Sequence, residues 1–383
     1  MDNVWLVNGT LLTPHGVVQG AVKIRGERIV ALQRSAPSSA NRIDVRGAYV
    51  APGFIDVHVW GEPATIARES PKGGTTAFLT TLGPALSKTL VNRIAERVQC
   101  RASTGAACLG IHLEGPFVNP ACGGALPRRG MRAPTIPELK RLLLAAQGRL
   151  RLVTMAPELP GALEAIRWCR THGVAVSLGH SEAASSMALR AVEAGAKAVT
   201  HVFNGMRPLS HRAPTLIDVA LTDPRVTTMV IADGIHVSPR AFQLLVHAKG
   251  VERIALVTDS IRYQGWKAIA RGGAFYTTTG VLAGSNLTMM RAVRNAVEFA
   301  SLPVLEAVRM ASEVPARLLG LERSRGSLTV GKRADLVVFD RRFRVLLTMV
   351  GGRIVWRSAG AIRWPREWLN PVIGPPLTRC FVP

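Results

Sequence analysis

The sequence lacks several features that would each assign it to a class of protein. No stretch approaches the roughly 18 uncharged apolar residues that a membrane-spanning helix needs. The first residues, MDNVWLVNGT, have no basic region before an apolar run, so we expect no secretory signal peptide. The five cysteines form no Cys-x-x-Cys pair, and their odd number argues against a disulfide framework. These absences predict a cytoplasmic protein without a membrane segment.

Acidic residues are scarce relative to basic ones. The chain has 48 Lys and Arg against 25 Asp and Glu, which gives a formal charge of +23. A charge of this size would suit nucleic-acid binding. The basic residues are nevertheless scattered as single residues or short pairs, and no zinc finger or RNP-like aromatic motif accompanies them. We therefore do not expect nucleic acid to be the main partner, whereas an anionic small molecule is compatible with the charge.

The two ends of the chain share a strand-like pattern. Residues 4–50 alternate apolar and polar positions between Gly and Asn breaks, and residues 326–357 repeat this style in GSLTVGKRADLVVFD and RVLLTMVGGRIVWR. At 383 residues the chain exceeds the usual size of one domain. We therefore predict a small β-sandwich domain built from both termini, comprising residues 1–52 and 326–383.

The middle of the chain, residues 53–325, follows a different rhythm. Strand-like and helical segments alternate there in about eight units, which indicates a parallel sheet with helical crossovers closed into a (β/α)₈ barrel. No G-x-G-x-x-G motif follows the first strand of this region, which counts against a dinucleotide-binding fold. The expected fold class is therefore α/β, with a TIM-type barrel and the small β-sandwich domain.

Polar side chains close several of the predicted barrel strands: Glu114, His180, His201, His236 and Asp259. The C-terminal ends of all strands open on the same face of a parallel barrel, so these residues can converge although they are far apart in sequence. Two imidazoles and a carboxylate can hold Zn²⁺ or a similar ion and leave a position for water, whose proton an unligated Asp could take. Each residue also has a structural explanation, such as capping the turn that follows it. The joint pattern favours a site.

The segments that carry these residues resemble those of a known family. IHLEGPFVNP, TMAPEL, SLGHSEA, THVFNGMRPL, IADGIHVSP and LVTDS look, in this order, like the signature segments of the N-acetylglucosamine-6-phosphate deacetylases. The closing segment ASEVPARLLGLERSRGSLTVGKRADLVVFD is similar to the tail found across the amidohydrolase superfamily. The likeness extends from about Val4 to Trp356 and leaves out the last residues.

The resemblance implies roles for individual residues. Glu114, His180 and His201 match the metal ligands, and Asp259 matches the catalytic acid/base. The positions that match the binding site for the sugar and its 6-phosphate are Asn204, Gly205, Arg212 and His236. The implied enzyme is a homodimer that uses a divalent ion, expected to be Zn²⁺, and a water molecule to split an N-acetyl group into acetate and a free amine.

Two departures from the family pattern affect the expected site. His58-x-Trp60 stands where some relatives carry two histidines, so we expect one metal ion, with His58 as an auxiliary ligand or, as we favour, a hydrogen-bonding residue. Leu126 stands where the family has a histidine that polarises the scissile carbonyl. Arg128 or Arg129, from the same loop, could replace that donor.

Further differences in the loops leave the substrate open. The segment NGMRPLSHRAPTL departs from the family at Gly205, Ala213 and Thr215, and LVTDSIRYQGW is bulkier than usual. An amidohydrolase that acts on another, non-phosphorylated N-acyl compound is therefore one alternative. A barrel that binds without catalysing is a second alternative, which Trp60 and Leu126 favour and the intact polar cluster opposes.

Overall fold

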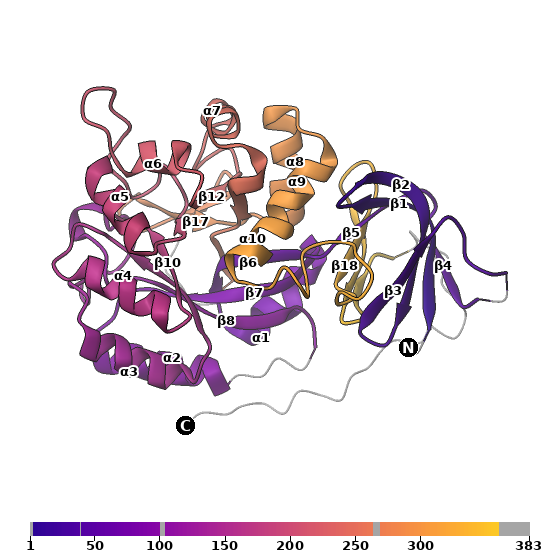
Figure 1. Cartoon of the computed structure of the whole chain (residues 1–383), viewed down its shortest axis with the longest axis horizontal. Coiled ribbons are helices and arrows are strands. Elements are labelled where there is room, and N and C mark those ends of the chain that lie inside the picture. Colours follow the sequence, from indigo (N-terminus) through magenta and orange to yellow (C-terminus); the bar gives the residue numbers. More distant parts are fainter. Residues whose placement is uncertain (1–2, 39, 100–103, 263–268, 360–383) are drawn as a thin grey trace.

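The structure, a computed structural model, describes residues 3–38, 40–99, 104–262 and 269–359 (Figure 1). Residues 263–266 of the bulky segment LVTDSIRYQGW lie outside this described part, as does the chain beyond residue 359. Within it, no helix has both the length and the apolar character needed to cross a membrane.

Strands from both ends of the chain form the smaller of two sheets. Its order is β20-β19-β18-β5-β1-β2-β3, with β4 beside β1. The antiparallel pairing of β18 with β5 joins the C-terminal strands to the N-terminal ones, as predicted. The limits of the domain at residues 52 and 326 stay predictions. The strands are β1 (Val4–Thr13), β2 (Gly16–Arg25), β3 (Arg28–Gln33), β4 (Arg42–Asp44), β5 (Tyr49–Pro52), β18 (Leu336–Phe339), β19 (Val345–Val350) and β20 (Arg353–Arg357).

The larger sheet contains the barrel. From β6 to β13 each strand pairs in parallel with the next, and β13 also contacts β6, so the sheet curls back on itself. This confirms the predicted barrel. The strands are β6 (Phe54–Gly61), β7 (Thr75–Leu82), β8 (Ala107–Glu114), β9 (Leu150–Met155), β10 (Ala175–Leu178), β11 (Ala198–Val199), β12 (Thr227–Ile231) and β13 (Ile254–Val257).

A short meander follows the last barrel strand and extends the sheet beyond β6. It consists of β14 (Ser260–Arg262), β15 (Ile269–Arg271), β16 (Ala274–Tyr276) and β17 (Leu282–Ser285). Because β14 pairs with β6 and β17 pairs with β14, this segment lies beside the end of the first barrel strand. The sequence patterns did not predict it.

Helices cover the outside of the barrel strands (Figure 1). Their inward faces are apolar: α8, for example, buries Met289, Ala292, Val293 and Ala296, and Thr288 caps its first turn. The helices are α1 (Pro63–Glu69), α2 (Ser87–Gln99), α3 (Ile136–Ala146), α4 (Ala162–Thr171), α5 (Ser185–Ala194), α6 (Leu216–Thr222), α7 (Pro239–Lys249), α8 (Met289–Ala300), α9 (Val304–Ala311) and α10 (Glu313–Leu318), with short 3₁₀ turns at η1 (Ser70–Gly73), η2 (Pro120–Cys122) and η3 (Val251–Arg253).

A glycine stands at the junction of the two sheets. Gly74, just before β7, has φ +80°, and a Cβ there would lie 2.9 Å both from Cε2 of Phe54 on β6 and from Cγ2 of Val337 on β18. Both neighbouring side chains are fully buried. The two sheets therefore approach each other at a point where only a residue without a side chain fits.

We expect Gly74→Ala to destabilise the protein more than Gly148→Ala. The two glycines have nearly the same φ, +80° and +78°, but a Cβ at Gly148 would have no atom within 4 Å. Backbone strain alone should cost roughly 1–2 kcal/mol in both variants. Overpacking against Phe54 and Val337 should add roughly 1–3 kcal/mol at Gly74. Denaturant unfolding of both variants measures the difference, and equal losses would contradict this account of the junction.

Candidate active site

A buried carboxylate is the centre of the site. Glu114, the last residue of β8, is 3% exposed, and its Oε1 lies 2.9 Å from Nε2 of His180 and 2.7 Å from Nε2 of His201. The two histidines stand two residues after the ends of β10 and β11, with φ +47° and +27°, values that non-glycine residues rarely adopt. Strained backbone at strand ends is characteristic of functional sites, since the surrounding structure must hold it in place.

His58, on β6, joins this cluster from the opposite side. Its Nε2 lies 3.5 Å from Oε2 of Glu114 and 3.0 Å from Oδ1 of Asp259, which follows β13. Single ligand atoms of His58, Glu114 and His201 all lie within 4.8 Å of one another. The structure therefore brings together the three residues predicted as metal ligands, the predicted acid/base and the predicted auxiliary histidine.

The hydrogen bonds of His180 indicate that a cation belongs beside Glu114. Nδ1 of His180 lies 2.8 Å from the carbonyl oxygen of Cys122, and a carbonyl can only accept, so Nδ1 carries a proton. In a neutral imidazole, Nε2 would then turn its lone pair toward the Glu114 oxygen. Either a second proton or a metal ion must stand between these two electron-rich atoms. Two or more imidazoles and a carboxylate are a donor set that suits a divalent ion, so the residues fit.

The pKa values of the cluster agree with this demand for positive charge. Burial opposes ionisation, but the charge of His58 and the hydrogen bonds from the other two imidazoles hold the pKa of Glu114 well below its usual value. Burial likewise lowers the pKa of His58, yet the Glu114 and Asp259 carboxylates outweigh it and raise that pKa to about 9. The site thus keeps its carboxylate ionised and collects positive charge around it.

Trp60 holds the predicted acid/base. Its indole Nε1–H donates a hydrogen bond of 2.9 Å to Oδ1 of Asp259, the same oxygen that His58 approaches. Among the residues that the structure describes, Oδ2 of Asp259 makes no hydrogen bond. The residue that replaces the second histidine therefore contacts one oxygen of the predicted acid/base and leaves the other oxygen without a bond to a described residue. The sequence revealed the replacement but not this contact.

A chain of buried polar groups supports His58 from beneath. Nδ1 of His58 lies 2.9 Å from Nδ1 of His112, and Nε2 of His112 lies 2.8 Å from Oγ1 of Thr154. The chain continues to Thr200 and Ser177. Burial, reinforced by the charge of His58, lowers the pKa of His112 well below its usual value, so His112 is neutral. Sequence reasoning missed His112, although it stands only two residues before Glu114 on the same strand.

A cavity of about 220 Å³ opens onto this cluster. It contains three of the four predicted substrate-binding residues, Asn204, Gly205 and His236. Nδ1 of His236 lies 2.6 Å from Oδ2 of Asp233, which fixes the orientation of the ring. The lining residues are Trp60, Glu114, Gly124, Ala125, Leu126, His180, His201, Asn204, Gly205, His236, Asp259, Val281, Leu282, Ala283 and Gly284.

Gly205 lies close against His180. It has φ +60°, and a Cβ there would lie 2.7 Å from Nδ1 of His180. A larger residue would therefore push against the imidazole at its bond to the Cys122 carbonyl. The glycine allows the loop after β11 to close over His180.

Three predicted residues stand apart from this cavity. Arg212, Arg128 and Arg129 are exposed, and none of them lines it. Leu126 does line it, so an apolar side chain occupies the wall at the position where the resemblance led us to expect a carbonyl-polarising histidine. The roles predicted for the three arginines stay predictions.

Comparisons with known proteins agree with this geometry. The family model described as "Amidohydrolase family" matches residues 49–355. The chain is 33% identical to an N-acetylglucosamine-6-phosphate deacetylase of Bacillus subtilis (strain 168), over 92% of this chain and 96% of the relative. It is 36% identical to an N-acetylgalactosamine-6-phosphate deacetylase of Escherichia coli O157:H7, over 90% and 97% of the two chains.

A solved structure shows the same likeness in three dimensions. It is that of a mutant N-acetyl-D-glucosamine-6-phosphate deacetylase from Mycobacterium smegmatis in complex with N-acetyl-D-glucosamine-6-phosphate. The two structures share 33% sequence identity and a TM-score of 0.84, and the match covers 93% of this chain and all of the other. The chain therefore belongs to the amidohydrolase family and, within it, to the N-acetylglucosamine-6-phosphate deacetylases and their close relatives.

Proposed function

We propose that the chain removes the acetyl group from N-acetylglucosamine 6-phosphate or a close relative such as its galacto epimer. The observation that carries this proposal is the convergence of His180 and His201 on one oxygen of Glu114, with Asp259 beside them. Relatives named as deacetylases of both sugar phosphates, at 33% and 36% identity over nearly their whole length, support the choice of substrate.

Glu114, His180 and His201 would hold one divalent ion, which we propose to be Zn²⁺, with His58 at its edge. The bound ion supplies Lewis-acid polarisation of the amide carbonyl and acidifies a water molecule. Bonds made through Nε2 fit His180, because its Nδ1–H is committed to the Cys122 carbonyl. His112 and the threonines beneath His58 keep that ring in one orientation.

Asp259 moves the proton. In this proposal its Oδ2 takes a proton from the attacking water and delivers it to the amide nitrogen as the C–N bond breaks. Trp60 and His58 both contact Oδ1, so the carboxylate cannot rotate freely between the two steps. Asn204, Gly205 and His236 line the side of the cavity where the sugar would bind.

Leu126 sets a limit on the rate. A hydrocarbon side chain gives no hydrogen bond to the developing oxyanion, a loss of about 3 kcal/mol, or about 100-fold, relative to a positioned donor. Arg128 and Arg129 stay candidates for that role only if the exposed loop that carries them rearranges on substrate binding. The homodimer and the cytoplasmic location expected from the sequence also stay predictions.

The purified protein should hydrolyse N-acetylglucosamine 6-phosphate, its galacto epimer, or both.

Asp259→Asn should lower kcat by more than about 1,000-fold and keep the metal, because the carboxylate that moves the proton is lost. Glu114→Gln should lose the metal itself, because it removes the anionic ligand. Acetate release and metal analysis measure the two effects. Stoichiometric metal without acetate release from either sugar phosphate would contradict the proposed substrate, and a metal-free protein would favour the non-catalytic barrel.

We expect Trp60→Phe to slow the reaction through Asp259. The variant keeps an aromatic ring but loses the Nε1–H···Oδ1 bond, and a hydrogen bond to a charged group is worth roughly 1.5–3 kcal/mol. The loss should appear as about a 10- to 100-fold decrease in kcat, with a shifted pH–rate profile.

Trp168→Phe is the matched control for this variant. Trp168 lies on α4, where it stacks on His172, and it does not line the cavity. This control should retain the kcat and the pH profile of the parent. A Trp60→Phe variant indistinguishable from Trp168→Phe in both quantities would show that the indole N–H does not position Asp259.

A further inference from the structure

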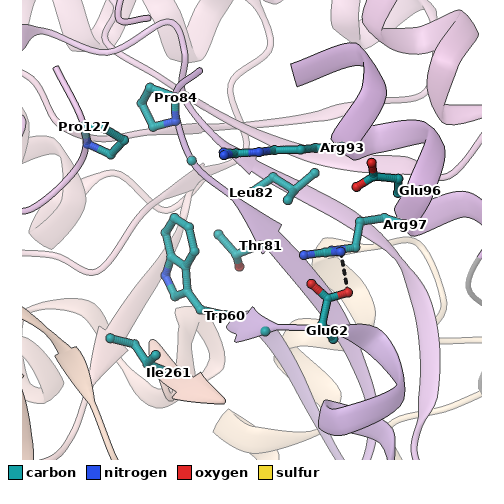
Figure 2. Close-up of a pocket in the computed structure, with 12 residues that line it drawn as sticks. Trp60, Glu62, Thr81, Leu82, Pro84, Arg93, Glu96, Arg97, Pro127 and Ile261 are labelled. Carbon is teal, nitrogen blue, oxygen red and sulfur yellow. Dashed lines mark hydrogen bonds and ion pairs between the residues drawn. The ribbon is translucent and has the colours of Figure 1, made fainter. Parts of the chain in front are cut away.

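A second cavity lies beside the catalytic one, and Trp60 lines both of them. Figure 2 shows the side chains that line this second cavity. Its volume is about 430 Å³, larger than the catalytic cavity. It is formed over the ends of β6 and β7 and is closed on one side by helix α2, and its lining residues are Trp60, Gly61, Glu62, Thr81, Leu82, Gly83, Pro84, Arg93, Glu96, Arg97, Pro127 and Ile261. We call it the Thr81 cavity.

The wall between the two cavities is built from the residues that depart from the family pattern. A Cβ at Gly83 would lie 2.8 Å from Cη2 of Trp60 and 3.5 Å from Cδ2 of Leu126, so the indole and the leucine approach each other across this glycine. Leu126 lines the catalytic cavity, and the next residue, Pro127, lines the Thr81 cavity. A ligand that passes this wall therefore meets Trp60 and Leu126.

Two buried polar atoms of the Thr81 cavity lack partners. Thr81 stands opposite Trp60 in the pairing of β7 with β6 and is 2% exposed, yet its Oγ1 makes no hydrogen bond to any described residue. Nε of Arg97 is likewise buried and unpaired, although Nη1 of the same side chain lies 2.5 Å from Oε2 of Glu62. Buried donors without acceptors are unfavourable, so this cavity is prepared to receive an acceptor.

The charged groups of the cavity point to an acceptor that is anionic. Figure 2 shows the guanidinium groups of Arg93 and Arg97 reaching from α2 toward Trp60 and Thr81, with the carboxyl of Glu96 closer to the helix. Arg97 pairs with Glu62, whereas neither Arg93 nor Glu96 forms an ion pair with a described residue. Of these two, Arg93 extends its charged group toward Trp60, so the part of the cavity that faces Trp60 presents an unpaired guanidinium. A guanidinium presents parallel N–H groups that match the two oxygens of a carboxylate.

The position of the cavity assigns it to one end of the substrate. Asn204, Gly205 and His236, proposed above to contact the sugar, follow β11 and β12. β7, which carries Thr81, stands four strands away from β11 in either direction around the cylinder, so the Thr81 cavity faces these residues across the cluster around Glu114. A sugar bound at the first group, with its amide at the cluster, directs its acyl chain toward Trp60 and the Thr81 cavity.

We propose that the Thr81 cavity is an acyl subsite that accepts N-acyl chains longer than acetyl and ending in a carboxylate. This inference rests on the proposed amide hydrolysis. One water is consumed: its hydroxyl joins the acyl carbon to give a dicarboxylate, the C–N bond breaks, and the amine nitrogen takes the proton. Arg93, Arg97 and the Thr81 hydroxyl bind the distal carboxylate, and Trp60 packs against the chain that leads to it.

The test compares two amides of glucosamine 6-phosphate that have equal chain length, N-succinyl and N-butanoyl, on the metal-loaded full chain. The parent should prefer the succinyl amide by about tenfold or more in kcat/KM, since one charge-assisted hydrogen bond accounts for that factor. Thr81→Val and Arg93→Gln should each reduce the preference about tenfold, whereas Thr81→Ser, which keeps the hydroxyl, should retain it. Lys88→Gln removes an exposed charge from the same helix outside the lining and should also retain it.

The outcomes separate this inference from the proposed function. Hydrolysis of the N-acetyl compound without any preference for succinyl over butanoyl, or a preference that survives both Thr81→Val and Arg93→Gln, would overturn the acyl subsite and leave the deacetylase standing. If the parent protein hydrolyses none of these amides, including the N-acetyl compound, the proposed deacetylase function is rejected instead. Calorimetric titration with succinate would then decide about the cavity: binding weakened by Thr81→Val supports an oxyanion site, and no binding overturns it.

Discussion

The site depends on one buried negative charge. Glu114 is removed from water at the end of β8, and an isolated carboxylate in that environment would be very unfavourable. His58, His180 and His201 surround it, and Asp259 adds a second carboxylate nearby, so the cluster has a net demand for positive charge. His180, His201 and Asp259 have positive φ angles, a strained conformation for residues with a side chain. This strain accompanies the turning of three strand ends toward that charge.

The features that could be predicted from the sequence were those with a periodic or local signature. Alternation of strands and helices indicated the barrel, and Glu114, His180 and His201 were found because each closes a recognisable strand. Contacts between distant side chains had no such signature. The hydrogen bond from Trp60 to Asp259 and the contact of His58 with His112 depend on the register of neighbouring strands. The periodicity of the sequence does not determine that register. Arg212 shows the reverse case, since its motif matched the family while its side chain lies on the exposed surface.

Trp60 and Leu126 were the two reasons to doubt catalysis, and the structure gives each a place in the site. The indole replaces an imidazole without breaking the cluster, because it donates a hydrogen bond to Asp259, the proposed acid/base. The leucine removes a polar group from the wall of the catalytic cavity. Both side chains meet at Gly83, so they form one altered region of the barrel mouth. A coordinated change at this wall is what a shift in acyl-group selectivity requires.

The pairing of β5 with β18 has a consequence for biosynthesis. Strands β1 to β5 leave the ribosome before the barrel does, but their sheet is completed only after the whole barrel has been translated, because β18 to β20 follow α10 in the chain. The edge of β5 is therefore unpaired until β18 has been synthesised, a condition that exposes nascent chains to intermolecular strand pairing. Closure of the small sheet is thus a late step of high contact order, and it depends on the barrel having brought β5 and β18 together.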